Sequence, residues 1–532
     1  MDEPIPSPGR RSYWLFAALV VAVAATLRLH GLSQHSITID ESTIVAFASS
    51  ILEQGYPAVR VGTMEIQLAT YELYSYILAL AIGLFGTSEV AVRLPSALFG
   101  IGTAYLIYSA GCKWFNLRTG IIAGLLYATA SWAIFWSQNA FHPQSHQFFG
   151  MLTLMQAVII LRAQPVPTRT YYLAALFFCS GFLCWEGLGF ILPVLAISAL
   201  IVSWGDWKWL KNRHLWIACA IVSAVIVAQG VRRVLLQDNY LNIGFGRSEI
   251  AGPELAFVQP YYQPYFYMVQ IFGWYTQLVL TIMFGLGLLF ARGHWHFRFL
   301  AVFVVTAVLI MANLLSYYAF HYIYFALPAF VIAVAGATVI IVDRLGGGAS
   351  SPLRRGGAWA GAILLTAAAG LELATAGVVG LKTYSITANA QNPPRGAYGT
   401  RLAVELIDYR GLTASLRTLY VPGDPILRMH PFSLRQYTGM HGDTGMQNWT
   451  FQKVIFDPGG ERVYYIDKGS GNPILRTLRE FDDVLAREDR MWFIAPDEIF
   501  ASAIDKETLA YFQRRAKLKA ESYRGAVHVW SR

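Results

Sequence analysis

Long, nearly uncharged apolar runs constrain this chain more than any other feature. The first, Tyr13 to Leu29, follows two arginines, and similar runs recur as far as about residue 379. Because ~20 apolar residues suffice to cross a bilayer as a helix, we predict a polytopic α-helical membrane protein. About eleven spans are expected, near residues 13–31, 94–111, 120–137, 147–162, 171–185, 187–204, 215–231, 266–291, 299–316, 322–342 and 358–379.

The basic residues of the short loops predict the orientation. With a cytoplasmic N-terminus, the inner loops hold most of the lysines and arginines and the outer loops hold few, as the positive-inside rule expects. This places a large first loop, residues 33–93, and everything after residue 380 outside the cytoplasm. The same loops explain the excess of 41 Lys and Arg over 32 Asp and Glu, so we expect no nucleic-acid partner.

Two adjacent carboxylates, Asp40 and Glu41, come shortly after the first predicted span. Apolar residues at helical spacing come next and predict a short amphipathic surface helix: Ile44, Phe47, Ala48, Ile51 and Leu52. Asp40 therefore stands where a spanning helix leaves the bilayer and a surface helix begins. It either caps that helix, since Asp accepts backbone N–H bonds, or serves as a catalytic carboxylate, and the pattern alone leaves both interpretations open.

Other polar side chains gather at predicted outer membrane edges. An ionisable group at membrane depth indicates a functional site by default, which applies to Glu186, although an interfacial turn explains it equally well. Glu65, in the first loop, is a weaker candidate. The loop after the third predicted span carries amide and imidazole groups suited to sugar hydroxyls: Gln138, Asn139 and His142.

Three outer arginines, Arg232, Arg233 and Arg247, run against the topology bias. Arginine binds phosphate with two parallel hydrogen bonds and keeps its charge, so these residues are candidate phosphate ligands. His321 and Tyr322 lie at another outer edge. An interfacial aromatic belt explains the tyrosine but does not explain the histidine.

From about residue 381 charged residues become frequent and long apolar runs stop. Strand-like runs at 418–421, 462–466, 491–495 and 526–530 alternate with helical periodicity at 474–485 and 507–522, which predicts an α/β fold. We therefore divide the chain into a membrane domain, 1–380, and an extracytoplasmic α/β domain, 381–532. No nucleotide loop, catalytic serine motif or metal-ligand spacing is visible, and no cofactor is expected.

The acidic pair and two later motifs resemble the GT-C glycosyltransferases, most closely the protein O-mannosyltransferase and aminoarabinose (lipid A) transferase branch. The resemblance covers roughly residues 10–345. The motifs that carry it are Asp40-Glu41, Phe85-Gly86 followed by Arg93-Leu94-Pro95-Ser96, and Tyr324 followed by Ala326-Leu327-Pro328. Three positions depart from the family pattern: Met64-Glu65-Ile66-Gln67 lacks a lysine, the 138–142 loop lacks arginine and aspartate, and His321 stands where other basic residues are common.

The resemblance implies transfer of a sugar from a polyprenyl-phosphate donor to a protein, lipid or glycan acceptor on the outer face of a bacterial or archaeal plasma membrane. Asp40 would be the base, and Glu41 would orient it, bind sugar or ligate a cation, although we expect no obligatory metal. Arg232, Arg233, Arg247 and His321 would contact the phosphate. A transporter or flippase of lipid-linked sugars is the alternative, but we find no inverted repeat to support it. An inert membrane scaffold bearing a glycan-binding outer domain is a third interpretation.

Overall fold

The structure, a computed structural model, describes most of the membrane part and pieces of the C-terminal region. The described residues are 10–33, 36–61, 64–68, 70–235, 277–314, 321–347, 409–421, 424, 426–428, 437, 444–445, 452–456, 463–467, 490–496, 514, 517–522 and 525–531. Arg247 and the predicted span 358–379 lie outside them.

Every predicted span up to residue 342 overlaps a helix or a helix pair of the described residues. These are α1 (Arg10–Leu29), α4 (Glu89–Trp114), α5 with α6 (Leu117–Thr129, Ser131–Ser137), α7 (Pro143–Arg162), α8 (Thr168–Cys184), η1 with α9 (Glu186–Phe190, Ile191–Val202), α10 (Arg213–Leu235), α12 (Gln277–Phe290), α13 (Trp295–Leu314) and η5 with α14 (Tyr324–Ala326, Leu327–Gly347). By length and apolar composition, five helices of the described chain suffice to cross a membrane, or six if the bent pair α5–α6 counts as one span. The chain is thus a polytopic helical membrane protein, and the total of eleven spans stays a prediction.

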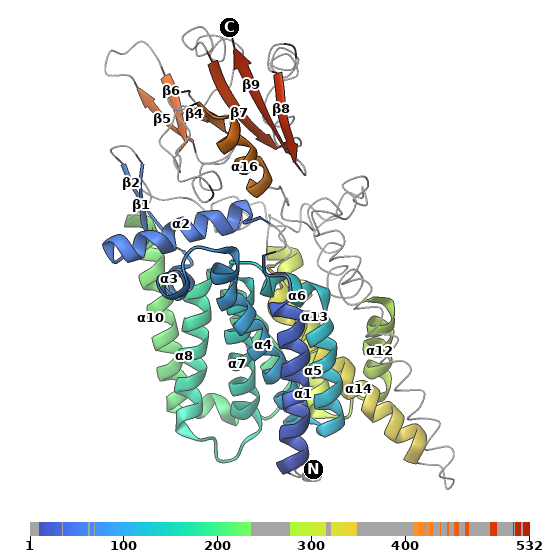
Figure 1. The fold of residues 1–532 in the computed structure, drawn as a ribbon. Coiled ribbons are helices and arrows are strands. Elements are labelled where there is room, and N and C mark those ends of the chain that lie inside the picture. The colour runs from blue at the N-terminus through green and yellow to red at the C-terminus, as the bar shows by residue number, and fades with distance from the viewer. Residues whose placement is uncertain are drawn as a thin grey trace.

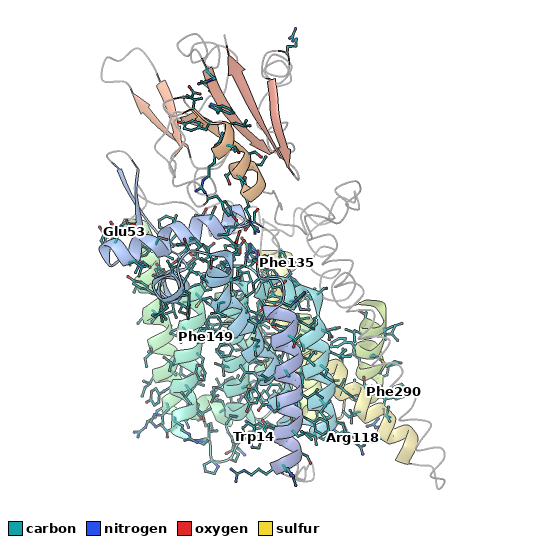
Figure 2. The ribbon with its side chains drawn as sticks, in the orientation of Figure 1. Trp14, Glu53, Arg118, Phe135, Phe149 and Phe290 are labelled. Atoms are coloured by element: carbon teal, nitrogen blue, oxygen red, sulfur yellow. The ribbon has the colours of Figure 1, made fainter. Side chains whose placement is uncertain are left out.

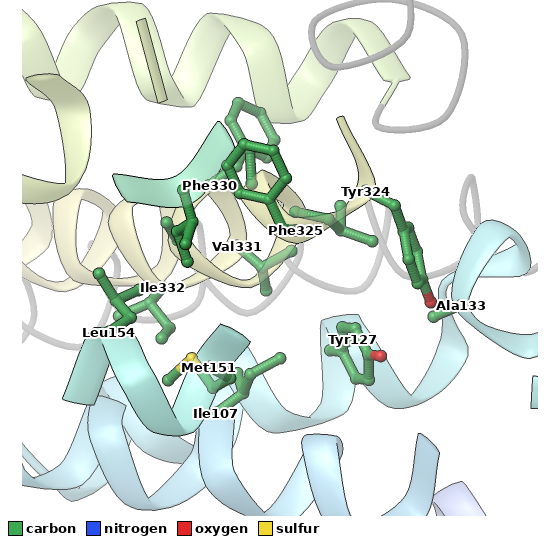
Figure 3. Close-up of a cluster of buried hydrophobic side chains, with 14 of the residues drawn as sticks. Ile107, Tyr127, Ala133, Met151, Leu154, Tyr324, Phe325, Phe330, Val331 and Ile332 are labelled. Carbon is green, nitrogen blue, oxygen red and sulfur yellow. The ribbon is translucent and has the colours of Figure 1, made fainter. Parts of the chain in front are cut away.

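Apolar packing holds the bundle together. Figure 3 shows Ile107 of α4, Met151 and Leu154 of α7 and Val331 of α14 facing one another in the interior, all of them buried. Small residues also let backbones touch: a Cβ atom at Gly111 on α4 would lie 2.8 Å from the Cα atom of Gly120 on α5. Such close approach is how helices gain dispersion energy in a membrane, and it gives the outer elements a rigid base.

The loop between α1 and α4 forms two helices and a hairpin. The predicted amphipathic helix is α2 (Ile39–Gln54), and the apolar run that follows is α3 (Glu72–Phe85), too short for a spanning helix. Between them β1 (Ala58–Val61) pairs antiparallel with β2 (Met64–Gln67), a hairpin that the sequence did not predict. Figure 1 shows α2 lying across one end of the bundle, opposite the end that holds the N-terminus.

The described residues of the C-terminal region form several strands and one helix. A sheet in the order β4-β3-β7-β9-β8 joins Thr444–Gly445, Ile426–Arg428, Arg490–Pro496, Gly525–Ser531 and Lys517–Ser522; β3 is parallel to β4 and to β7, and β9 is antiparallel to β7 and to β8. A separate hairpin pairs β5 (Gln452–Phe456) with β6 (Val463–Asp467). The region stands over the bundle end that carries α2 (Figure 1).

Two predictions in this region are wrong. The expected strand at 418–421 overlaps the end of a helix, α16 (Tyr409–Leu419), because Tyr409, Leu412 and Leu416 form one buried helical face. The end of the expected helix at 507–522 is strand β8, since Leu518 pairs with His528 of β9 and sheet pairing outweighs the local helical periodicity. The helix expected at 474–485 lies outside the described residues.

Candidate active site

The first turn of α2 carries the acidic pair, and its cap is Thr38. The Thr38 hydroxyl accepts a hydrogen bond from the Glu41 amide at 3.3 Å, and the Glu41 carboxylate accepts one from the Thr38 amide at 2.8 Å. This is a capping box, in which the cap and the residue three positions later satisfy each other. The interpretation of Asp40 as the cap is therefore wrong, because the helix begins one residue before Asp40.

Asp40 is left without a role in capping. Its side chain is exposed, and within the described part of the chain no hydrogen bond or ion pair involves its carboxylate. The protein that surrounds it on other sides nevertheless removes much of its hydration. This desolvation, followed by the neighbouring charge of Glu41, raises the pKa of Asp40 to about 6. An accessible carboxylate with such a pKa suits a general base near neutral pH.

Glu41 is held by Arg93, the arginine of the Arg-Leu-Pro-Ser motif on α4. Arg93 Nε lies 2.7 Å from Glu41 Oε1 and Arg93 Nη2 lies 2.9 Å from Oε2, while the Ala140 amide donates to Oε1 at 2.7 Å. Arg93 also donates to the carbonyl oxygens of Leu32, at 2.7 Å, and of Ser36, at 2.9 Å. Neither Glu41 nor Arg93 has any exposed side-chain surface. The pair thus fixes α4, the 138–142 loop and the start of α2 against one another.

Gln138 and Asn139 shape that loop. Gln138 Nε2 donates to the carbonyl oxygen of His30 at 2.7 Å and to that of Leu27 at 3.1 Å, and Asn139 Nδ2 donates to the carbonyl oxygen of Phe135 at 2.8 Å. The side-chain N–H groups of Gln138 and Asn139, which we predicted to bind sugar hydroxyls, therefore donate to backbone carbonyl oxygens instead. Figure 2 shows the side chains of this bundle end, which Phe135 on α6 and Glu53 on α2 mark.

His142 lies at the centre of an aromatic and imidazole cluster, which we define as Tyr71, His142, His146, Trp185 and His321. Its ring stacks on Tyr71 at 4.5 Å between centroids and on Trp185 at 5.1 Å, and it meets His321 edge-on at 5.0 Å. Neither ring nitrogen of the buried His142 has a hydrogen-bond partner among the described residues. Burial, with smaller effects of His321 and His146, holds the pKa of His142 well below its usual range, so the ring is neutral.

Tyr322 borders this cluster beside its member His321. Tyr322 lies 4.9 Å from His321 and 5.1 Å from Trp185 between ring centroids. Burial lowers the pKa of His321 to about 3, so the ring carries no charge near neutral pH. Tyr71 is the described non-glycine residue with a positive φ, 58°. A bulky side chain in that backbone region stores strain, which is common at functional sites.

Two predicted phosphate ligands are ion-paired with carboxylates, in an arginine cluster that we define as Glu72, Glu186, Gln229, Arg232 and Arg233. Arg232 pairs with Glu72, and Arg233 pairs with Glu186. Gln229 Nε2 donates to Glu72 at 2.6 Å. Desolvation raises the pKa of Glu186 to about 7 despite the charge of Arg233, and it also raises the pKa of Glu72.

Two short segments join these clusters. The 138–142 loop contacts Glu41 through the Ala140 amide and stacks on Tyr71 through His142. On either side of Tyr71, Thr70 donates to Glu186 at 3.1 Å and Glu72 meets Arg232. Most of the predicted site residues are therefore neighbours in one contact network. Glu65 lies on β2, but its side chain, like Arg247, is outside the described residues.

Sequence reasoning missed several members of this network. Thr38 had a readable signal, the Thr-x-x-Glu spacing of a capping box. Arg93 stood in a recognised motif, but nothing local indicated its partner. Gln229 and Thr70 gave no signal, since a single amide or hydroxyl beside an apolar run is common. Among the described residues, no group of three His, Cys, Asp or Glu side chains is arranged to hold a metal ion.

Comparison with known proteins finds one family that matches part of the chain and several solved structures with a similar fold. Residues 73–230 match the family described as dolichyl-phosphate-mannose-protein mannosyltransferase. No curated protein matches the chain. The fold is similar to that of ArnT from Cupriavidus metallidurans in the apo state, with a TM-score of 0.62, 14% identity and 98% of each chain covered.

Two further structures share the fold. The same ArnT bound to undecaprenyl phosphate gives a TM-score of 0.59 at 12% identity, covering 97% of this chain and 98% of that one. The oligosaccharyltransferase AglB from Archaeoglobus fulgidus, in complex with an inhibitory peptide and a dolichol-phosphate, gives 0.52 at 13% identity, covering 95% and 72%. Residues 73–230 are thus similar to the protein mannosyltransferase family, and the chain as a whole has the fold of ArnT.

Proposed function

We propose that this enzyme transfers a sugar from a polyprenyl-phosphate donor to an acceptor on the extracytoplasmic face, with Asp40 as the catalytic base. The observation that carries the proposal is Asp40 itself. It is an accessible carboxylate with a pKa of about 6, it has no role in capping, and its neighbour Glu41 is fixed by Arg93. Among the described residues the Asp40 carboxylate makes no hydrogen bond or ion pair, so it adds little to the stability of the fold. Its fixed position beside Glu41 therefore favours a functional role.

The proposed step needs a base beside the acceptor hydroxyl and cations beside the departing phosphate. Asp40 takes the proton of an acceptor hydroxyl, whose oxygen attacks the anomeric carbon of the donor sugar. The bond from that carbon to the phosphate oxygen breaks, and its electron pair leaves on the polyprenyl phosphate. Arg232 and Arg233 stabilise the departing negative charge. The donor phosphate must first replace Glu72 and Glu186 as their partner.

The aromatic and imidazole cluster is the proposed sugar subsite. Flat rings such as Tyr71 and Trp185 pack against the apolar face of a sugar, and the neutral ring of His142 offers one donor and one acceptor to its hydroxyls. His321, a member of the cluster, and Tyr322 beside it belong to the proposed subsite, as does Glu186, which follows Trp185 in the chain. The side-chain amides of Gln138 and Asn139 donate to backbone carbonyl oxygens, so we propose that these two residues shape the subsite. Since His321 is uncharged, it would meet a phosphate by hydrogen bonding alone. Glu65 and Arg247 remain candidates from the sequence.

The donor class also has support from proteins that share the fold, since ArnT of Cupriavidus metallidurans has been solved with undecaprenyl phosphate and AglB with a dolichol-phosphate. Orientation follows from the loop charges, which favour a cytoplasmic N-terminus and an extracytoplasmic C-terminal region in a bacterial or archaeal plasma membrane. A reporter enzyme fused after Arg532 should be active only outside the cytoplasm, and cytoplasmic activity would overturn this orientation.

One assay tests the reaction against its alternative. The purified full-length chain in nanodiscs is incubated with dolichyl-phosphate-mannose or with undecaprenyl-phosphate-linked sugars, with and without protein, lipid or glycan acceptors. Acceptor-dependent release of the polyprenyl phosphate is expected. A flippase would instead move the intact donor between leaflets of a vesicle without releasing phosphate, and that outcome would overturn the proposal.

A further inference from the structure

The C-terminal region contacts the segment that leads into Asp40. The hydroxyl of Tyr437 accepts a hydrogen bond from the Ile37 amide at 2.6 Å and donates one to Glu89 at 2.9 Å. Arg410, on α16, donates from its amide to the Ser36 hydroxyl at 3.0 Å. These partners are 400 and 374 residues apart in the chain, so they meet only in the folded protein. Figure 1 shows α16 above α2.

The side chain of Arg410 adds a charged contact. Its Nη2 lies 2.7 Å from a carboxylate oxygen of Glu89 and 2.9 Å from the carbonyl oxygen of Ser33. Glu89 is therefore shared by Arg410 and Tyr437. Its side chain is largely buried, with 15% exposed against 44% for Arg410. We call Glu89, Arg410 and Tyr437 the clasp.

The clasp and Arg93 hold the same segment from two sides. Glu89 and Arg93 are four residues apart on α4 and so lie on one face of that helix. Arg93 holds the carbonyl oxygen of Ser36 and the carboxylate of Glu41, while the clasp holds the Ser36 hydroxyl and the Ile37 amide. The next residue, Thr38, is the cap of α2.

We propose that Tyr437 and Arg410 are positioning residues, through which the C-terminal region fixes residues 36–38 and thereby the direction in which Asp40 is presented to the acceptor. This inference rests on the proposed role of Asp40 as the base. The reason is geometric: Asp40 lies in the first turn of α2, two residues after the cap, so a small shift of the cap moves its carboxylate. Displacements of about 1 Å at a reacting group can cost ~10²-fold in rate.

The test uses the ligand-free, full-length protein and two tyrosine variants. Tyr437→Phe removes the hydroxyl and keeps the ring. Tyr420→Phe is the matched control, because the Tyr420 hydroxyl donates to the carbonyl oxygen of Asp424, at 2.9 Å, within the C-terminal region itself. Hydrogen exchange of peptides covering residues 36–48 should be on the order of fivefold faster in Tyr437→Phe, the factor for one hydrogen bond of typical net strength. It should be unchanged in Tyr420→Phe.

Transfer kinetics supply the second measurement, with whichever polyprenyl-phosphate sugar the wild-type protein consumes. Tyr437→Phe should lower kcat severalfold at an unchanged KM for the donor, while the unfolding midpoint stays near that of Tyr420→Phe. If Tyr437→Phe does not fold, Arg410→Lys, which keeps the charge but loses the planar fork, takes its place, with the exposed Arg417→Lys on the same helix as the control.

Three outcomes would overturn the inference: unchanged exchange at residues 36–48, equal effects in the variant and its control, or faster exchange with unchanged kcat. Failure of the proposed function is distinguishable from these. Should Asp40→Asn keep full transfer activity, Asp40 is not the base, whereas the exchange measurement still reports whether the clasp holds the segment.

Discussion

Glu41 of the acidic pair and the carboxylates of the arginine cluster are all ion-paired with arginines. The two regions differ in how many hydrogen bonds the carboxylates accept and in how much of the arginine side chains is exposed. Glu41 and Arg93 have no exposed side-chain surface. Each oxygen of Glu41 accepts two hydrogen bonds, Oε1 from Arg93 and Ala140 and Oε2 from Arg93 and Thr38. In the arginine cluster, 37% of the Arg232 side chain and 19% of the Arg233 side chain are exposed.

This difference separates a fixed pair from an exchangeable one. A buried ion pair with full hydrogen bonding loses several kcal/mol when one partner is removed, because the other charge is left unpaired. An arginine that keeps contact with water can change its partner at a lower cost, because water screens the intermediate arrangements. In the described part of the chain, one oxygen of Glu72 also lacks a hydrogen-bond partner. We therefore infer that Glu41–Arg93 holds the site in place, whereas Arg232 and Arg233 can exchange their carboxylate partners for a phosphate.

The largest expected effect is on the rate of Asp40→Asn. The change removes the proton acceptor and preserves size, and general-base help is worth ~10²–10⁴-fold. Transfer should fall by that factor at an unchanged unfolding midpoint, because Asp40 neither caps α2 nor belongs to the buried pair. Turnover of the donor at close to the normal rate would sink the assignment of Asp40 as the base.

Arg93→Gln should have the largest effect on stability. It leaves the carboxylate of Glu41 buried without its counter-ion, which typically costs ~3–5 kcal/mol. Arg118→Gln is the control, because it breaks the surface pair of Arg118 and Asp343, whose side chains are 59% and 50% exposed, and such pairs contribute at most ~1 kcal/mol. Equal shifts of the unfolding midpoint in detergent would refute the distinction between fixed and exposed pairs.

The helices could be predicted from the sequence, whereas the pairings could not. Apolar length is a local property, and it located α1, α4 and the later membrane helices. The partner of Glu41 lies 52 residues away, and that of Glu72 lies 160 residues away. No local pattern encodes such contacts, because they depend on how the helices pack.

The cap of α2 could not be predicted for a different reason. Its signal, Thr38-x-x-Glu41, is present in the sequence, but Asp40 two residues later is an equally common type of capping residue, so the sequence alone offers two caps. The C-terminal errors at 418–421 and 517–522 have a third cause. Short segments with weak local preference take the conformation that their tertiary neighbours impose: α16 turns its buried face to the interior, and β8 pairs with β9.

The next effect tests whether Arg232 and Arg233, which are only partly exposed, can exchange their carboxylate partners for a phosphate. Arg233→Gln should raise the KM for the polyprenyl-phosphate donor by about 10- to 100-fold, the range for a hydrogen bond to a charged group. Its unfolding midpoint should change less than that of Arg93→Gln, because Glu186, with its pKa raised to about 7, can take up a proton when Arg233 is removed. Arg298→Gln, which removes a contact to the carbonyl oxygen of Val202 elsewhere in the bundle, should leave the KM unchanged. An unaltered KM in Arg233→Gln would make the arginine cluster a structural feature.

The pH dependence of the kinetics should also differ between the arginine cluster and Asp40. Glu186 faces Arg233, Glu72, Thr70 and Gln229, and its raised pKa of about 7 means that it gains a proton as the pH falls through neutrality. Protonation weakens its hold on Arg233, so donor affinity should rise as the pH falls, by no more than about tenfold per pH unit. In contrast, kcat should fall below about pH 6, where Asp40 is protonated. Glu186→Gln should abolish the pH dependence of KM and leave that of kcat, and a persisting KM profile would exclude Glu186 as its source.

The smallest effect concerns the cap, and it decides between the two interpretations of Asp40. Thr38→Ala removes the hydroxyl that accepts from the Glu41 amide, and loss of a cap costs ~1 kcal/mol. Thr38→Ser should restore most of that stability, because serine caps a helix as well as threonine does. Asp40→Ala, by comparison, should leave the unfolding midpoint nearly unchanged while abolishing transfer. If Asp40→Ala were the destabilising variant and Thr38→Ala silent, the carboxylate would be serving the helix rather than the reaction. The acidic pair would then be as fully committed to structure as Arg93 is, and the contrast with the arginine cluster would disappear.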